Sequence, residues 1–129
     1  MKTNYKHYQI TSVYKGTKNW NMNINNYNNH MIYITNKETN KRCAFEYWNS
    51  IAEGEIKTEE GLIYALFCFI NDSIQALDGL EYFIDEFGYE YKEGEKIYNQ
   101  CCKSLEKYYR VFTEDIIEIY NDLIDNYNC

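Results

Sequence analysis

The features that this sequence lacks already exclude several classes of function. The chain has only two histidines, His7 and His30, and neither has a cysteine or carboxylate neighbour at metal-ligand spacing. It contains no H-E-x-x-H, Walker, dinucleotide-binding or G-x-S-x-G motif. We therefore expect surface histidines and a non-enzymatic protein that holds no metal and no cofactor.

Long apolar runs and cysteine pairs are also missing. No apolar stretch approaches the ~20 residues that a membrane-spanning helix needs, and the first residues lack the apolar core of a signal peptide. The five cysteines include no C-x-x-C pair, so neither a zinc site nor a disulfide framework is indicated. We expect reduced thiols, no membrane segment and a cytoplasmic location.

What the chain does contain is a large amount of aromatic surface. Fifteen tyrosines and six phenylalanines contribute to an aromatic content of 18%, far more than a disordered chain carries. A length of 129 residues fits one domain, so we expect a single domain over residues 1–129. The absence of proline, with abundant Asn, Lys, Ile and Tyr, indicates an AT-rich genome.

The net charge of −7 is unevenly distributed. Residues 1–52 carry a net charge of +5, whereas residues 53–129 carry −12. The acidic part should repel nucleic acid and attract a basic surface, with association rates that fall as the salt concentration rises.

The basic part of the chain has the residue pattern of β-strands. Polar and apolar residues alternate from Tyr8 to Tyr14, where Lys15-Gly16 is expected to end the strand, and again from Trp20 to Ile24. Two further β-prone runs extend from Met31 to Thr35 and from Cys43 to Trp48. We therefore predict an antiparallel sheet of three to four strands within about residues 5–50.

The acidic part has helical periodicity. Thr58 is a candidate N-cap, and apolar residues then recur at helical spacing as far as Leu77. Asp78-Gly79 should open a short second helix, Leu80 to Phe87, and a third should span about residues 94–111. Thr113-Glu114-Asp115 should cap a fourth. The predicted fold is α+β, with the sheet packed on the helix at 59–77 and with a C-terminal bundle of about four helices at about residues 58–127.

Two surfaces are candidates for binding. The first is an acidic, tyrosine-rich helical surface, because tyrosine supplies contact area and carboxylates can occupy the positions where a partner expects phosphates. Its candidate partner-binding residues are Glu81, Tyr82, Asp85, Glu86, Tyr89, Glu90, Tyr91, Glu93 and Glu95. An ordinary solvated helix edge is the alternative interpretation.

The second candidate is a stacking platform for single-stranded nucleic acid in the strand region, where basic residues alternate with aromatic ones. The aromatic residues are Tyr5, Tyr8, Tyr14, Trp20, Tyr33, Phe45, Tyr47 and Trp48. The acidic net charge argues against direct nucleic-acid binding, and most of these rings are expected to be buried or half-buried in the sheet.

The helical region resembles a group of small phage and prophage proteins. These share a motif of phenylalanine, two acids, phenylalanine, glycine and tyrosine, which is Phe83 to Tyr89 here. A tyrosine and a cysteine follow on the next helix, here Tyr98 and Cys101 or Cys102. The resemblance covers roughly residues 60–112, and the continuation Glu90 to Glu93 departs from an Asp-rich pattern.

Small acidic phage proteins of this kind are similar in size and charge to inhibitors of bacterial defence, including anti-CRISPR proteins. The resemblance implies an inhibitor in the bacterial cytoplasm that binds a CRISPR–Cas effector through the acidic surface and blocks nucleic-acid access. The alternative is a phage regulatory or accessory protein that binds nucleic acid through the basic aromatic sheet. Exposed tyrosines and an open sheet edge also make a homodimer an expectation.

Overall fold

The computed structural model describes residues 1–19, 26–87, 96, 99–100, 102–103, 106 and 108–127. Only the backbone is described at residues 19, 76, 77 and 79–87. The chain forms two compact units, Met1–Leu66 and Phe67–Cys129, and each is described by itself. The single domain over 1–129 stays a prediction.

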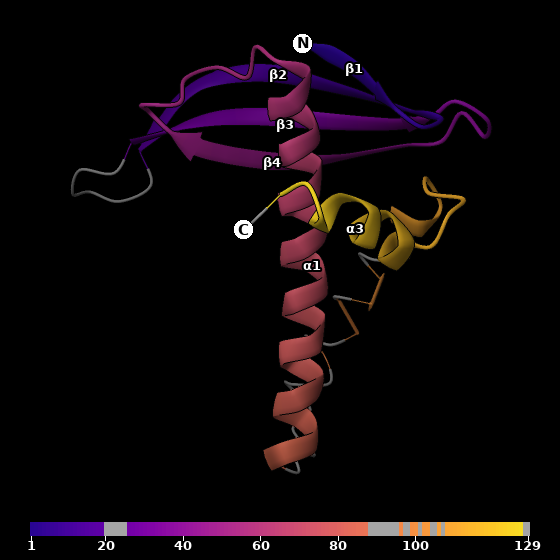
Figure 1. Ribbon diagram of the computed structural model, residues 1–129. Coiled ribbons are helices and arrows are strands. Elements are labelled where there is room, and N and C mark those ends of the chain that lie inside the picture. Colours follow the sequence, from indigo (N-terminus) through magenta and orange to yellow (C-terminus); the bar gives the residue numbers. More distant parts are fainter. Residues whose placement is uncertain are drawn as a thin grey trace. The chain divides into compact units, whose positions relative to one another are not determined.

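The first unit is built on a four-stranded antiparallel sheet in which neighbouring strands follow one another in the chain (Figure 1). Its strands are β1 (Lys2–Tyr5), β2 (Tyr8–Asn19), β3 (Asn26–Asn36) and β4 (Arg42–Ser50). The predicted runs at 31–35 and 43–48 lie inside β3 and β4, whereas the predicted run at 20–24 lies outside the described residues. The antiparallel α+β class is confirmed.

Strand β2 does not end at Lys15-Gly16, so that prediction was wrong. The register with β3 shifts between Tyr14 and Thr17, and pairing then continues to Asn19 opposite Asn26. Gly16 has a φ of 89°, which glycine adopts without strain, and a single such residue makes a bulge that bends a strand without ending it.

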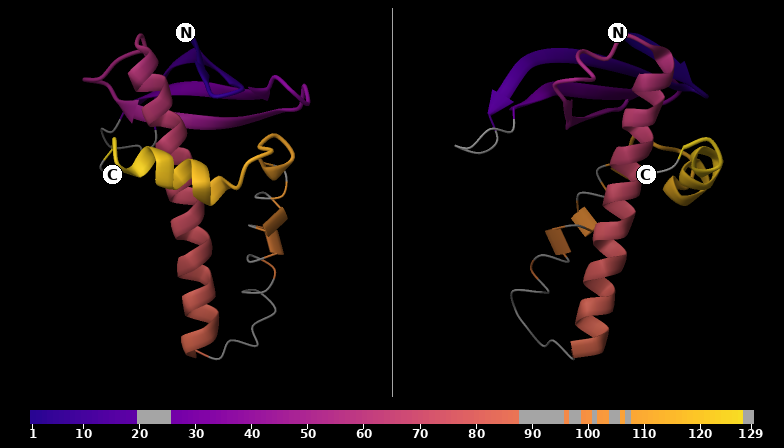
Figure 2. Two further views of the ribbon diagram at one scale, coloured as in Figure 1. Left: turned by 45° about the vertical axis from the view of Figure 1, so that its right-hand side comes forward. Right: turned by 60° about the vertical axis from the view of Figure 1, so that its left-hand side comes forward.

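Alternation along the strands gives the sheet two different faces. We define the inner face by its buried residues, which lie in rows across the strands: Thr3, Ile10, Ile34 and Cys43 in one row, and Ser12, Ile32 and Phe45 in the next. Leu62, Ala65 and Leu66 in the first turns of the following helix are also fully buried. These turns lie beside the sheet in every view (Figure 2), so the inner face and the helix start form the core of the first unit.

Helix α1 (Glu59–Phe87) is a single helix of 29 residues. Its start was predicted correctly, because the Thr58 hydroxyl Oγ1 accepts a hydrogen bond from the Gly61 N–H at 3.0 Å. The predicted break at Asp78-Gly79 was wrong. A glycine costs a helix only about 1 kcal/mol relative to alanine, and with no proline nearby that cost does not end the helix.

The second helix with defined bounds is α3 (Ile116–Ile124). Its N-cap is Asp115, the last residue of the predicted cap Thr113-Glu114-Asp115, since the Asp115 carboxylate accepts a hydrogen bond from the Ile117 N–H at 2.9 Å. Over the described residues, α1 and α3 are the two such helices. Ten of the 18 residues of the predicted third helix are described, and those as far as Tyr109 are helical, but no helix with defined bounds is described there. The predicted bundle of about four helices was therefore wrong.

The second unit has an aromatic and polar centre. The ring of Phe67 stacks on the rings of Tyr120 and Tyr127, with distances between ring centres of 5.6 Å and 5.7 Å. The Tyr120 hydroxyl donates a 2.8 Å hydrogen bond to Oδ1 of the buried Asn71. These contacts join the α3 region to the part of α1 that follows Leu66. None of the helices described is both long enough and apolar enough to cross a membrane.

Candidate nucleic-acid interface on the outer sheet face

The face of the sheet opposite the core stays accessible, and we call it the outer face. Every residue of it on β2, β3 and β4 is exposed or half-buried. It consists of five cross-strand rows: Gln9, Thr35 and Arg42; Thr11, Tyr33 and Ala44; Val13, Met31 and Glu46; Asn29 and Trp48; and Lys18, Tyr27 and Ser50.

Two cations of the outer face lie over aromatic rings. The guanidinium of Arg42 is 4.0 Å from the centre of the Tyr33 ring, and Nζ of Lys18 is 5.2 Å from the Trp48 ring. The small side chain of Ala44, opposite Tyr33, leaves room for the Arg42 contact. Both are cation–π pairs, which hold each ring and its positive charge at one place on the surface.

The two pairs lie towards opposite ends of the outer face. Trp48 is opposite Asn29, and Tyr33 is four residues farther along β3. At roughly 3.3 Å per residue, the two ring positions are about 13 Å apart along the strand direction. The row of Val13, Met31 and Glu46 lies between them. A ligand that contacts both rings must therefore be extended and must pass over this row.

The charge of the outer face differs from that of the whole chain. Lys18 and Arg42 belong to it, and Lys2 on β1 joins it because Lys2 lies opposite Thr11. Glu46 is the one acid among its described residues. Over the sequence, residues 1–66 carry a net charge of +2 and residues 67–129 carry −9. The acidic net charge thus comes from the second unit, and the outer face is locally basic.

Only part of the sequence-predicted platform is on the outer face. Tyr33 and Trp48 lie there, whereas Tyr8 and Phe45 are buried in the core. The inner-face rows contain the other described rings, Tyr5, Tyr14 and Tyr47, and Trp20 is outside the described residues. Tyr27 was missed within an asparagine-rich stretch. Tyr27 lies four residues before Met31 and six before Tyr33, and residues separated by an even number share a face of a strand, so this spacing could have identified it.

The side chains of the predicted acidic surface all lie outside those that the structure describes. Glu81, Tyr82, Asp85 and Glu86 belong to the last turns of α1, where only the backbone is described. Tyr89, Glu90, Tyr91, Glu93 and Glu95 lie outside the described residues. These nine residues remain a predicted binding surface.

His30 is a core residue rather than a surface histidine, so that expectation was wrong. Its side chain is 0% exposed on β3, and its Nε2 accepts a hydrogen bond from the Ile56 N–H at 3.4 Å. Burial lowers the pKa of His30 below its usual value of 6.5, and this outweighs the opposing effects of the Tyr47 backbone and of Glu55. A neutral His30 therefore holds the segment before α1 against the inner face.

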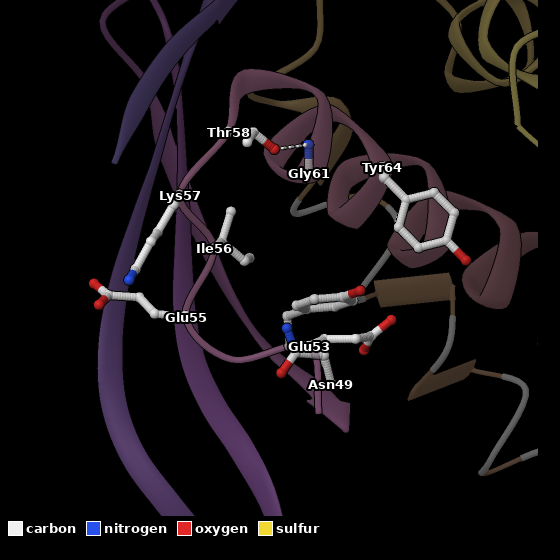
Figure 3. Close-up of a pocket in the computed structure, with 9 residues that line it drawn as sticks. Asn49, Glu53, Glu55, Ile56, Lys57, Thr58, Gly61 and Tyr64 are labelled. Atoms are coloured by element: carbon white, nitrogen blue, oxygen red, sulfur yellow. Dashed lines mark hydrogen bonds between the residues drawn. The ribbon is translucent and has the colours of Figure 1, made fainter. Parts of the chain in front are cut away.

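A pocket of about 320 Å³ opens beside this segment. Figure 3 shows Thr58 and Gly61 at the start of α1, with Asn49 and Glu53 across the pocket. The Asn49 amide donates a hydrogen bond to the Gly54 carbonyl at 3.0 Å. No cluster of three metal-ligating side chains occurs in the described part of the chain.

Comparison with protein-family models, with curated proteins and with solved structures found no match for this chain. Its function is therefore inferred from its own surfaces.

Proposed function

We propose that this protein binds single-stranded nucleic acid through the outer face of its sheet, as a phage regulatory or accessory protein without catalytic activity. The observation that carries the proposal is the presence of the Arg42–Tyr33 and Lys18–Trp48 pairs on one accessible sheet face. Such a protein would act in the cytoplasm of the bacterial host.

The chemistry of these pairs suits an unpaired strand. Unstacked bases pack on aromatic faces, and each such contact contributes roughly 1–3 kcal/mol. The neighbouring cations can neutralise backbone phosphates. With the three cations of the outer face, the logarithm of the binding constant should fall with the logarithm of salt concentration with a slope of about −2. A duplex hides its base faces and should bind more weakly.

The proposal is tested by fluorescence anisotropy at low salt. A labelled single strand of about twelve nucleotides and its duplex are titrated with wild-type protein and with Trp48→Ala and Tyr33→Ala. Each substitution should weaken binding about fivefold or more, since each removes one stacking contact. Tyr109→Ala is the matched control, because Tyr109 is 44% exposed and lies in the second unit. Absence of single-strand binding, or equal binding by all four proteins, would refute the proposal.

A second candidate function is inhibition of a CRISPR–Cas effector by the acidic surface of residues 81–95. Two observations favour it. Helix α1 continues without a break to Phe87, which gives four of the nine predicted residues a regular helical backbone. The second unit also carries a net charge of −9, which complements a basic nucleic-acid groove. The bound inhibitor would block DNA access by charge mimicry.

Charge reversal tests this second candidate in a DNA-cleavage assay with a purified effector. Replacing Asp85, Glu86, Glu90 and Glu93 by lysine should abolish inhibition. The control carries the same change in net charge elsewhere in the second unit, by lysine substitution of the exposed residues Asp72, Glu106, Glu118 and Asp125. Equal loss in both variants would indicate a general effect of charge, and inhibition that persists in the first variant would exclude the acidic surface.

A further inference from the structure

We infer that Glu46 makes the outer face selective, favouring a base with an exocyclic amino group at the position between the two cation–aromatic pairs. This inference rests on the proposed binding of single-stranded nucleic acid, and it adds a preference among bases to that function.

Glu46 occupies the central row of the outer face. It lies opposite Met31, which in turn lies opposite Val13. The Tyr33 row and the Trp48 row are each two residues away along the strands, about 7 Å in either direction. A strand whose bases stack on both rings must therefore pass close to the Glu46 carboxylate.

The surroundings of Glu46 leave its carboxylate able to bind a ligand. Its side chain is exposed, and no hydrogen bond or ion pair joins it to another residue in the part of the chain that the structure describes. Its two neighbours in the row, Met31 and Val13, are apolar. They provide a surface for the flat ring of a base and no counter-charge for a phosphate.

A carboxylate in this position distinguishes bases by the sign of the group that they present. An ionised carboxylate only accepts hydrogen bonds, so it attracts an amino group such as N4 of cytosine. Uracil presents a carbonyl oxygen at the same ring position, and two acceptors facing each other repel. A phosphate at the same place would also be repelled, which keeps the backbone of the strand beside the cations.

The consequence is a division of roles along the outer face. The two aromatic rings bind any base by stacking, because every base has a flat face. Lys18 and Arg42 set the place of the backbone, and Glu46 reads one base between them. Sequence preference then depends on a residue that contributes nothing to the attraction of the phosphate backbone.

The test compares two oligonucleotides of about eight nucleotides, one of deoxycytidine and one of deoxyuridine, which differ at ring positions 3 and 4 and lack the thymine methyl group. Wild-type protein should bind the deoxycytidine strand about three- to tenfold more tightly, as expected for one charge-assisted hydrogen bond at an exposed site. Glu46→Gln should remove most of this preference, because an amide both donates and accepts. Glu38→Gln is the matched control, since Glu38 is an exposed acid in the β3–β4 turn.

The outcomes separate this inference from the proposed function. If neither strand binds to any of the proteins, the proposed function fails and this inference fails with it. If wild-type protein binds both strands equally, or if the preference for deoxycytidine survives in Glu46→Gln, single-strand binding stands and the role of Glu46 is refuted. Loss of the preference in Glu46→Gln, with its retention in Glu38→Gln, supports the assignment.

Discussion

Along β3, alternate residues belong to two surfaces of different character. Ile32 and Ile34 on the inner face are fully buried, whereas Met31 and Tyr33 on the outer face are half-buried. The inner face is closed by the start of α1 and by the segment before it, and the outer face presents rings and cations. Strand β3 therefore contributes its inner-face residues to stability and its outer-face residues to the proposed binding.

The polar residues of the two faces differ in the same way. On the inner face, Oδ1 of the buried Asn36 accepts hydrogen bonds from the backbone N–H groups of Glu38 and Thr39 in the β3–β4 turn. On the outer face, the Glu46 carboxylate has no such contact among the described residues. Because a buried polar group without a partner is costly, the hydrogen bonds of Asn36 stabilise the fold. An exposed carboxylate carries no such cost and is available to a ligand.

The largest effect should come from a substitution on the inner face. Ile32→Ala should lower the free energy of unfolding by about 2–5 kcal/mol, because it removes a fully buried side chain and leaves a cavity. Urea denaturation followed by circular dichroism measures the change. Met31→Ala, one residue earlier, should cost about 1 kcal/mol or less, since its side chain is already half in water. Equal losses would show that the two faces do not differ in burial.

Sequence periodicity predicted much of this division, because it depends on alternation within each strand. The runs at 31–35 and 43–48 were recognised from such alternation. Strand β1 was missed because Lys2–Tyr5 has no apolar alternation and forms its ladder with the backbone of β2. The break at Asp78-Gly79 was predicted from a local turn pattern, but the helix continues through these two residues to Phe87.

The candidate interface was less predictable than the strands. Tyr33 and Trp48 were named as possible stacking rings, but their placement on one face depends on the register between β3 and β4. That register is a property of the paired strands and cannot be obtained from either strand alone. The Lys18–Trp48 pair spans β2 and β4, so it depends on two registers and on the bulge at Gly16. The basic charge of the strand region was recognised from the sequence, but the acidic net charge of the whole chain argued against nucleic-acid binding.

A smaller effect is expected from pH, and it should be confined to the inner face. Because the pKa of His30 is lowered in the folded state, the unfolded state binds more protons between that value and 6.5. The free energy of unfolding should therefore be highest above pH 6.5 and should fall as the pH drops through this interval. Urea denaturation at pH 7.5 and at several lower pH values measures the dependence.

His30→Gln provides the comparison for this pH dependence. Glutamine does not titrate, so the variant should lose the part of the pH dependence between 6.5 and the lowered pKa, whatever its own stability. His7→Gln is the matched control, because His7 lies in the β1–β2 turn. A wild-type slope that persists unchanged in His30→Gln would show that another group is responsible.

The smallest effect should be on the salt dependence of binding by the outer face. Lys18→Ala should make the slope of log binding constant against log salt less steep by about 0.7, the contribution of one phosphate contact on a single strand. Because Lys18 is exposed, the free energy of unfolding should change by no more than about 0.5 kcal/mol. Lys37→Ala removes an exposed cation from the β3–β4 turn and should leave the slope unchanged. If both variants change the slope equally, binding depends on the total charge of the first unit. The outer face would then not be the specific binding site.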